Sequence, residues 1–283
     1  MTSIENIIWA VVWFLILGGV FGFLLAIFSK LFYVKKAPKV DEIAELLPSA
    51  NCGGCGYSGC AALAEAIAEG KAKPNSCRAT SNENILKISR IIGVANEENV
   101  RYTAHVMCSG SSNKTKRKFI YDGIETCIAA SKIAGGDKMC SFGCLGFGTC
   151  VSACKFDAIH IINGVSVVDP EKCRACGMCV SSCPKNLIEL IPYDSKHWVS
   201  CKSTENGAQT VKYCDVGCIG CKKCEKVCKT NAIKVENNIA KIDYSLCKNC
   251  GECLNVCPRK IIKTSQFQKK EYVILDNFPI QSK

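Results

Sequence analysis

The residues of this sequence best suited to chemistry lie in a block of cysteines between Cys140 and Cys257. The spacing Cys-x2-Cys-x2-Cys-x3-Cys occurs there three times in full and once incompletely. The complete copies run over Cys173–Cys183, Cys218–Cys228 and Cys247–Cys257. Three thiolates on one tight loop can hold three corners of an iron–sulfur cubane, and a thiol from elsewhere must hold the fourth. The block therefore predicts 4Fe-4S clusters.

The number of cysteines predicts how large the modules are. The chain has 283 residues, of which 24 are cysteine. Modules built around metal clusters fold with fewer residues than a hydrophobic core demands, because metal binding contributes folding free energy. We therefore expect several small modules rather than two large domains. A disulfide scaffold is the alternative, but the repeated spacing favours metal, and reduced thiolates should face a reducing cytoplasm.

The formal net charge of +11 could indicate a nucleic-acid partner. However, each 4Fe-4S centre with four thiolates adds about two negative charges, so five clusters would contribute about −10. The excess of basic residues is then nearly cancelled, and we expect no nucleic-acid partner. A zinc-dependent nucleic-acid-binding protein is the least favoured alternative, which colour and metal analysis would identify.

An apolar stretch from Ile7 to Phe28 contains no charged residue and is long enough to cross a bilayer as one helix. A cleaved signal peptide is the alternative, but Glu5 precedes the stretch and no small-x-small cleavage site follows it. The lysines after the span are Lys30, Lys35, Lys36 and Lys39. The positive-inside rule then places the N-terminus outside and the bulk of the chain on the cytoplasmic side of the cell membrane. Residues 1–34 are the predicted transmembrane anchor.

Residues 35–100 are predicted to form a helical domain for a single 4Fe-4S cluster, with a glycine-rich turn between two short helices. The candidate ligands are Cys52, Cys55, Cys60 and Cys77. Glycines between these thiols fit a backbone that wraps close to a cluster and donates N–H groups to its sulfurs. Zinc also accepts four thiolates, but the glycines and the neighbouring cluster motifs favour iron and sulfur.

Two segments of the cysteine block are copies of one another. MCSFGCLGFGTCVSAC, residues 139–154, aligns with YCDVGCIGCKKCEKVC, residues 213–228. The alignment pairs Cys140 with Cys214 and Cys144 with Cys218, but Phe147 stands where the second copy has Cys221. The first copy therefore lacks the middle ligand of its loop, and Cys140 is the nearest thiol that could replace it.

In bacterial two-cluster ferredoxins the fourth cysteine of each run ligates the other cluster. This rule predicts two interlocked pairs of clusters here. The first unit, residues 101–200, would use Cys140, Cys144, Cys150 and Cys183 for one cluster, and Cys173, Cys176, Cys179 and Cys154 for the other. The second unit, residues 201–263, would use Cys218, Cys221, Cys224 and Cys257 for one cluster, and Cys247, Cys250, Cys253 and Cys228 for the other. The chain would then hold five clusters.

Four cysteines remain outside these sets: Cys108, Cys127, Cys201 and Cys214. HVMCSG around Cys108 resembles WVSCKS around Cys201, so the repeat extends outward from the block. A sixth cluster on these four thiols is one interpretation. Unligated buried cysteines, which are ordinary core residues, are the other.

The fold class expected is a set of small α+β modules: one N-terminal transmembrane helix, the helical single-cluster domain and two tandem two-cluster ferredoxin-like units. Two segments between the cysteine runs show apolar residues in alternate positions around an Asn or Gly turn, which predicts hairpins. They are AIHIINGVSVVD and AIKVENNIAKID. Residues 109–118, SGSSNKTKRK, predict a solvated basic loop. Residues 264–283 form a C-terminal tail with one strand-like run, Tyr272 to Leu275.

The combination of an N-terminal span, LLPSANCGGCGYSGC with Cys77, and tandem cysteine units resembles the B subunits of Rnf complexes, which are membrane-bound ferredoxin:NAD oxidoreductases. The resemblance covers nearly the whole chain. It implies a subunit that accepts electrons from soluble ferredoxin and passes them to membrane partners, while other subunits carry flavin and reduce NAD. In the family this transfer is coupled to sodium or proton translocation. The chain departs from the family pattern in two ways. Phe147 stands at a ligand position, and Lys155 and Lys229 replace the proline that often follows the fourth cysteine of a run.

No catalytic residues are expected on this chain. Gly146-x-Gly148 lacks the third glycine and the strand of a dinucleotide site, so it does not predict NAD binding. Lys222 and Lys223 are the predicted docking residues for an acidic ferredoxin. A stand-alone membrane-anchored polyferredoxin that relays electrons, or serves as a scaffold without an ion-pumping complex, is the alternative function.

Overall fold

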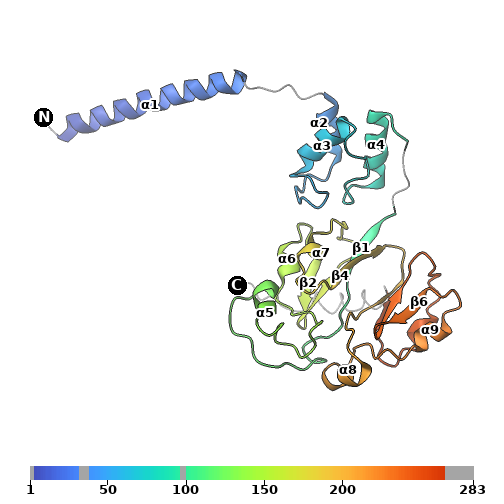
Figure 1. Cartoon of the computed structure of the whole chain (residues 1–283). Coiled ribbons are helices and arrows are strands. Elements are labelled where there is room, and N and C mark those ends of the chain that lie inside the picture. The colour runs from blue at the N-terminus through green and yellow to red at the C-terminus, as the bar shows by residue number, and fades with distance from the viewer. Residues whose placement is uncertain (1–2, 32–37, 96–99, 265–283) are drawn as a thin grey trace. The chain divides into compact units, whose positions relative to one another are not determined.

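The computed structural model describes residues 3–31, 38–95 and 100–264, and Figure 1 shows its helices and strands. The helices are α1 (Ser3–Leu31), α2 (Pro38–Leu46), α3 (Cys60–Ala68), α4 (Asn82–Ile92), α5 (Cys127–Lys132), α6 (Thr149–Ser152), α7 (Met178–Ser182), α8 (Gly207–Tyr213), α9 (Lys223–Val227) and α10 (Glu252–Asn255). The strands are β1 (Tyr102–Val106), β2 (Ile159–Ile162), β3 (Val165–Val168), β4 (Ile188–Pro192), β5 (His197–Val199), β6 (Ile233–Glu236), β7 (Ile239–Ile242) and β8 (Ile262–Thr264). The predicted run Tyr272 to Leu275 lies outside the described residues, as do Lys35 and Lys36.

Helix α1 covers the whole predicted span and confirms that it is helical. The stretch Ile7–Leu31 is long and apolar enough to cross a membrane, and it is the one such helix in the described part of the chain. Its apolar side chains are exposed on every side of the helix. A helix that is apolar all round suits lipid better than water.

Helices α2, α3 and α4 belong to the predicted single-cluster region, and the spacing of apolar residues indicates each of them. Ser81 caps α4 by accepting a hydrogen bond from the Asn84 amide, and Gly93 ends this helix with a left-handed φ of 73°. The Asn84 side chain donates to the Leu46 carbonyl at 2.8 Å, which ties α4 to the end of α2. The core residues are Ile43, Leu63, Ile67, Ile85 and Ile88. This small core holds the glycine-rich loop between α2 and α3.

The two predicted hairpins are confirmed. Strand β2 pairs antiparallel with β3, and β6 pairs antiparallel with β7. Both residues of each turn have positive φ, namely 47° and 74° at Asn163 and Gly164, and 49° and 63° at Asn237 and Asn238. This is the backbone of a type I′ turn, whose twist matches that of the strands it joins. The two units thus share the same central hairpin.

A second pair of short strands frames each unit, and no pattern in the sequence predicted it. Strand β1 pairs antiparallel with β4, and β5 pairs antiparallel with β8. Strand β5 precedes the predicted boundary at residue 200, but its pairing places it with the second unit, where it is counted from here on. Cys108 follows two residues after β1, and Cys201 follows two residues after β5. The strand pairs therefore place these two cysteines at equivalent points of the two units.

Residues 109–118 differ from the predicted solvated loop. Their lysine and arginine side chains are exposed, but their backbone is paired with residues of both units. Thr115 forms a β-bridge with Cys214, and Arg117 forms one with Lys138. The Lys116 amide also donates to the Tyr213 carbonyl at 2.9 Å. The segment thus joins the two units, which its polar composition alone does not indicate.

Four short helices begin at the cysteine loops, and each follows a residue in the left-handed conformation. Glycine takes this position before α6, α7 and α10, at Gly148, Gly177 and Gly251. Before α9 the residue is Lys222, with φ 57°. A non-glycine residue in this conformation costs about 1 kcal/mol or more. Lys222 is therefore held at a strained position that glycine fills in the other three copies.

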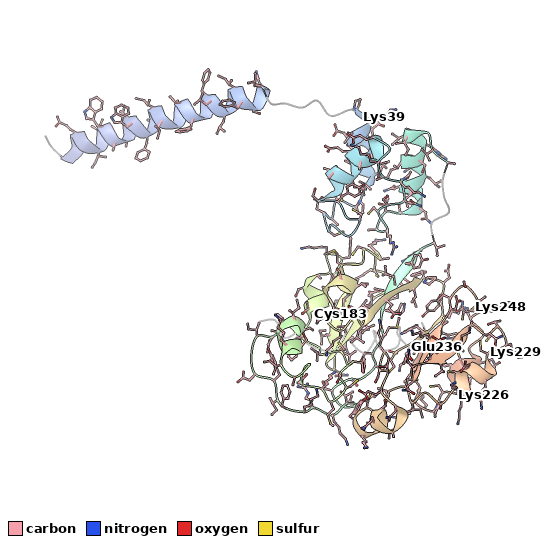
Figure 2. The ribbon with its side chains drawn as sticks, in the orientation of Figure 1. Lys39, Cys183, Lys226, Lys229, Glu236 and Lys248 are labelled. Carbon is pink, nitrogen blue, oxygen red and sulfur yellow. The ribbon has the colours of Figure 1, made fainter. Side chains whose placement is uncertain are left out.

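Exposed lysines are frequent on the second unit. Lys226, Lys229 and Lys248 are exposed and project outward (Figure 2). Together with Lys222 and Lys223, which are also exposed, they give this unit a basic surface around α9.

Gly146 provides a test of how tightly the first cysteine loop packs on its hairpin. Its φ is +79°, and a Cβ there would lie 2.6 Å from the Gly164 carbonyl oxygen. We expect Gly146→Ala to destabilise the protein by about 2–4 kcal/mol, through strain and overpacking of backbone against backbone. Gly177→Ala is the matched control, because φ there is +84° but the space is open. The control should cost about 1 kcal/mol. Urea denaturation followed by visible absorbance would measure both, and equal costs would contradict the packing argument.

Candidate metal centres

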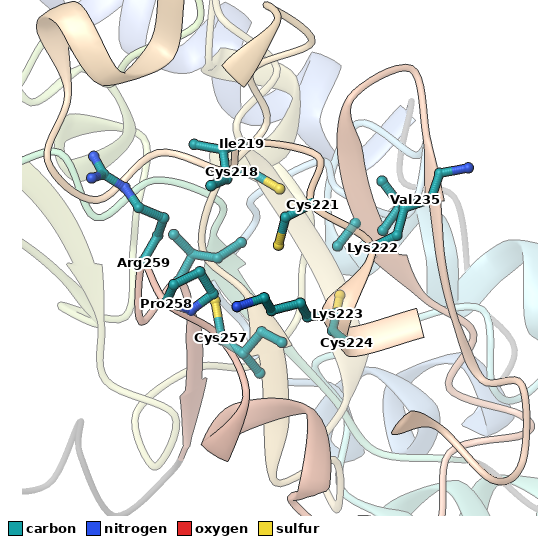
Figure 3. Close-up of a pocket in the computed structure, with 13 residues that line it drawn as sticks. Cys218, Ile219, Cys221, Lys222, Lys223, Cys224, Val235, Cys257, Pro258 and Arg259 are labelled. Atoms are coloured by element: carbon teal, nitrogen blue, oxygen red, sulfur yellow. The ribbon is translucent and has the colours of Figure 1, made fainter. Parts of the chain in front are cut away.

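The predicted set in the second unit lines one pocket. Cys218, Cys221 and Cys224 come from the loop before α9 and its first turn, and Cys257 follows α10. The sulfurs of these four residues point into the same space (Figure 3). Burial raises the pKa of the Cys224 thiol to about 11, with further contributions from the thiols of Cys218, Cys257 and Cys221. Thiols that repel one another in this way are stabilised as thiolates by a bound cation.

A second pocket holds the corresponding set of the first unit. Its cysteines are Cys154, Cys173, Cys176 and Cys179, and most of the other lining residues are apolar, with Arg174 as the charged exception. The amides of Ala104 and Ala175 donate to Cys173 Sγ at 3.4 and 3.5 Å. The Ala158 amide donates to Cys154 Sγ at 3.5 Å. Backbone N–H groups aimed at ligand sulfurs are the outer support expected around an iron–sulfur cluster.

The other set of the second unit is also gathered by the fold. Burial raises the pKa of the Cys253 thiol to about 11, and the neighbouring thiols of Cys247, Cys250 and Cys228 raise it further. Burial also acts to raise the pKa of Cys228, but hydrogen bonds from Thr230 and from the backbone of Ile233 outweigh it. Cys228 thus lies beside the Cys247–Cys253 loop although it belongs to the preceding run, as the interlocked prediction requires.

In the remaining part of the first unit, a cysteine outside the predicted set lies near Cys150. Burial raises the pKa of the Cys150 thiol to about 11, and its neighbouring thiols are Cys144, Cys127 and Cys183. Cys127 begins α5 and packs in one apolar cluster with Phe147, the residue that replaces a ligand. The Cys127 amide also donates to Thr149 Oγ1 at 2.9 Å. Cys127 thus lies between Cys150 and the residue that replaces a ligand.

Cys140, the predicted substitute, packs instead with Tyr213 and Cys214 from the second unit. No signal in the sequence pointed to Cys127, because this residue has no counterpart in the second copy. Alignment of the two copies alone could only point to the nearest thiol along the chain.

The predicted ligands of the single-cluster domain lie on two loops. Cys52 and Cys55 lie between α2 and α3, Cys60 is the first residue of α3, and Cys77 is buried between α3 and α4. The Cys60 amide donates to Asn51 Oδ1 at 2.8 Å, which closes the glycine-rich loop. Gly53 and Gly56 have φ of 71° and 88°, so glycine is required for this turn. The ligand set itself stays a prediction.

The donor chemistry of these sites fits 4Fe-4S clusters. All 24 cysteines lie in the described residues, and none forms a disulfide there. Among the described residues, no three His, Cys, Asp or Glu side chains converge closely enough for a single ion. In two of the sets the thiols instead line pockets whose other lining residues are mostly apolar, and some of the sulfurs receive backbone N–H groups. A cubane needs its four ligands spread around it in this manner.

Comparison with protein-family models agrees with this chemistry. Residues 47–79 match the model described as "Putative Fe-S cluster". Residues 172–232 and 217–261 match the 4Fe-4S dicluster domain. The first match contains all four candidate ligands of the single-cluster domain, and the other two contain the complete cysteine runs.

Comparison with characterised proteins extends over most of the chain. The B subunit of an ion-translocating oxidoreductase complex from Methanosarcina acetivorans is 41% identical over 87% of this chain and 94% of its own length. The B subunit of the Na(+)-translocating ferredoxin:NAD(+) oxidoreductase complex of Acetobacterium woodii is 40% identical over 87% of this chain and 74% of its own length. Its counterpart in the proton-translocating complex of Clostridium ljungdahlii is 42% identical over 88% of this chain and 89% of its own. The chain belongs to the family of B subunits of ion-translocating oxidoreductase complexes.

Proposed function

We propose that this chain accepts electrons from reduced soluble ferredoxin and relays them to membrane-bound and flavin-carrying subunits of an ion-translocating ferredoxin:NAD oxidoreductase complex. The observation that carries the proposal is the interlocked arrangement of thiols. Cys154 lines the site of the Cys173–Cys179 loop, and Cys228 lies beside the Cys247–Cys253 loop. Shared runs of this kind keep paired centres close together, as electron transfer requires.

The clusters, when bound, would supply centres that take up and release single electrons. The chain's own residues hold and shield them. Ala104 and Ala175 direct N–H groups at a ligand sulfur, which stabilises its negative charge. Ile159 and Leu190 form part of the wall of the same pocket and limit access of water. No residue of the chain needs to act as an acid, base or nucleophile.

The proposed ligands follow the predicted sets, with one change. The change is that Cys127 joins Cys144, Cys150 and Cys183, because these are the thiols around Cys150. The other proposed sets are Cys52, Cys55, Cys60 and Cys77; Cys154, Cys173, Cys176 and Cys179; Cys218, Cys221, Cys224 and Cys257; and Cys228, Cys247, Cys250 and Cys253. The chain would be anchored by α1 with its N-terminus outside and the sites on the cytoplasmic side.

The second unit is the proposed point of electron entry. Cys221 and Cys250 are the two exposed cysteines, and they belong to the two different sites of this unit. Lys222 and Lys223 lie beside the first of these sites and line its pocket. Because electrons tunnel only over short distances, a donor must approach an exposed site, and a basic rim attracts an acidic one. Lys222 also keeps a strained conformation, which is a frequent mark of a functional position.

We expect Cys127→Ala to remove one cluster, because Cys144, Cys150 and Cys183 supply only three ligands and Phe147 stands where the fourth would be. Iron and acid-labile sulfide should each fall by about four per chain. The measurement uses the full chain in detergent, with Phe147→Ala as the control that disturbs the same apolar cluster without removing a thiol. Unchanged iron in Cys127→Ala would remove this residue from the ligand set and return Cys140 to consideration.

We expect Lys222→Gly to raise stability by about 1 kcal/mol, because glycine adopts φ of 57° without strain. The same substitution should slow reduction by acidic ferredoxin about two- to five-fold at low salt, with a smaller difference at high salt. Stopped-flow absorbance at several ionic strengths measures the rate. A variant that is more stable but is reduced more slowly would show that Lys222 acts in docking and not in stabilising the fold.

Two further variants serve as controls for this experiment. Lys223→Gln should slow reduction without raising stability. Lys132→Gln, which removes an exposed charge from α5 of the first unit, should change neither. Equal rates in the wild type and in all three variants would exclude this face as the docking site. Purification with polytopic membrane proteins and flavin would support the complex, whereas a lone chain would support the stand-alone polyferredoxin.

A further inference from the structure

Four cysteines lie outside the five proposed ligand sets once Cys127 is assigned: Cys108, Cys140, Cys201 and Cys214. They form two equivalent pairs, because Cys108 corresponds to Cys201 and Cys140 corresponds to Cys214 in the internal repeat. Each unit therefore contributes the same two thiols. A site made from all four would lie between the units and would be pseudo-symmetric.

The fold brings the first members of these pairs near the opposite unit. Ser109 Oγ donates to Ser200 Oγ at 2.6 Å, which joins the residue after Cys108 to the residue before Cys201. A Cβ built on Gly110 would lie 3.5 Å from Cys108 Sγ and 3.8 Å from Cys214 Sγ. Both sulfurs thus face the same glycine, although they come from different units.

The second members are in direct contact. Cys140, Tyr213 and Cys214 pack together as buried residues of one cluster. Burial raises the pKa of the Cys201 thiol to about 11, and Cys140 is among the neighbouring thiols that raise it further. Burial also raises the pKa of Cys214, and Cys140 again contributes. Cys140 is therefore the thiol to which both cysteines of the second unit are neighbours.

Backbone hydrogen bonds show that Cys108 and Cys201 have the same environment. The Cys144 amide donates to Cys108 Sγ at 3.5 Å, and the Cys218 amide donates to Cys201 Sγ at 3.3 Å. The site that contains Cys218 already has four cysteine ligands, so Cys201 is not needed there. In the first unit Cys108 packs against Cys144 and Cys183, but the proposed assignment of Cys127 already completes that site. Each of these two thiols is free to serve a site of its own.

A buried lysine supplies an independent reason to expect negative charge here. Lys138 is 1% exposed, and its ammonium donates to the carbonyls of Gly110 and Gly164 at 2.8 and 3.0 Å. The adjacent Asp137 pairs with Arg117 at 3.0 Å instead, and no carboxylate in the described part of the chain pairs with Lys138. A buried ammonium without a counterion is costly. The thiols of Cys108 and Cys140 are close enough to interact electrostatically with it.

We propose that Cys108, Cys140, Cys201 and Cys214 bind a sixth 4Fe-4S cluster at the junction of the two ferredoxin-like units. Four thiolates around such a cluster leave about two net negative charges, which would neutralise the ammonium of Lys138. Every cysteine of the chain would then be a cluster ligand. The role of a cluster at this position in electron transfer rests on the proposed relay, because the cluster would connect the two pairs of sites. The metal site itself does not depend on that function.

The test is a count of iron and acid-labile sulfide in the full-length protein, purified in detergent without oxygen. Six clusters predict about 24 of each per chain, whereas five predict about 20. Because this measurement needs no variant, a wild-type value of about 20 would overturn the proposal without any question of misfolding. Cys108→Ala, Cys140→Ala, Cys201→Ala and Cys214→Ala should each lower the count to about 20.

Double variants decide whether the four thiols share one cluster. Cys108→Ala with Cys201→Ala should still retain about 20 iron atoms, because both substitutions remove the same centre. Cys108→Ala with Cys127→Ala should retain about 16, because these residues belong to different sites. A value of about 16 for the first pair, or full iron content in Cys201→Ala, would refute a shared site.

Electron paramagnetic resonance of the reduced protein provides a second readout for the same variants. Loss of one signal with the others unchanged indicates a folded protein that lacks one cluster, as the proposal predicts. Loss of all signals in every single variant, together with a wild-type count of about 20, would count against it. Failure of soluble ferredoxin to reduce the wild type would contradict the proposed function, yet it would leave the iron count and the sixth site unaffected.

Discussion

The fold depends on one constraint, which is that a loop of three closely spaced thiols cannot complete the ligands of a cubane. A fourth thiol must come from a distant part of the chain. Cys257 thus lies at the pocket of the loop that begins at Cys218, and Cys154 lies at the pocket of the loop that begins at Cys173. Helices of four or five residues and two-stranded sheets cannot bury much apolar surface alone. Metal–thiolate bonds between distant segments are what can hold such small elements together.

Features marked by a local pattern or by the internal repeat could be predicted, and features that depend on pairing between remote segments could not. The hairpins at Asn163 and Asn237 follow from alternation around turn residues, and the complete cysteine runs follow from their spacing. The strands β1 and β5 are short, and their partners are remote in sequence, so no local pattern marks them. The bridge between Thr115 and Cys214 is equally remote and lies in a segment of polar composition. Cys127 has no counterpart in the second copy, so comparison of the copies passes over it.

The two units differ in their cysteine positions, and this difference is related to the length of one connecting segment. The segment from Cys108 to Cys140 is longer than the equivalent segment from Cys201 to Cys214, and the extra residues include α5. Helix α5 begins at Cys127, beside Phe147, whose ring lies 5.1 Å from that of Tyr121. The thiol that we propose in place of the ligand missing at Phe147 therefore lies in a segment that exists only in the longer connection. An aromatic cluster packs beside this thiol.

Two lysines occupy positions that are unfavourable for their own side chains or backbone, and the proposed negatively charged partners would account for both. Lys138 is buried with carbonyl oxygens as its hydrogen-bond acceptors, while Lys222 holds a left-handed conformation at which the equivalent copies have glycine. Local stability alone would favour an apolar residue at the first position and glycine at the second. A cluster with net negative charge favours an ammonium beside it in the interior, and an acidic donor favours one at the exposed rim. If both proposals hold, the same electrostatic preference explains one lysine inside the protein and one on its surface.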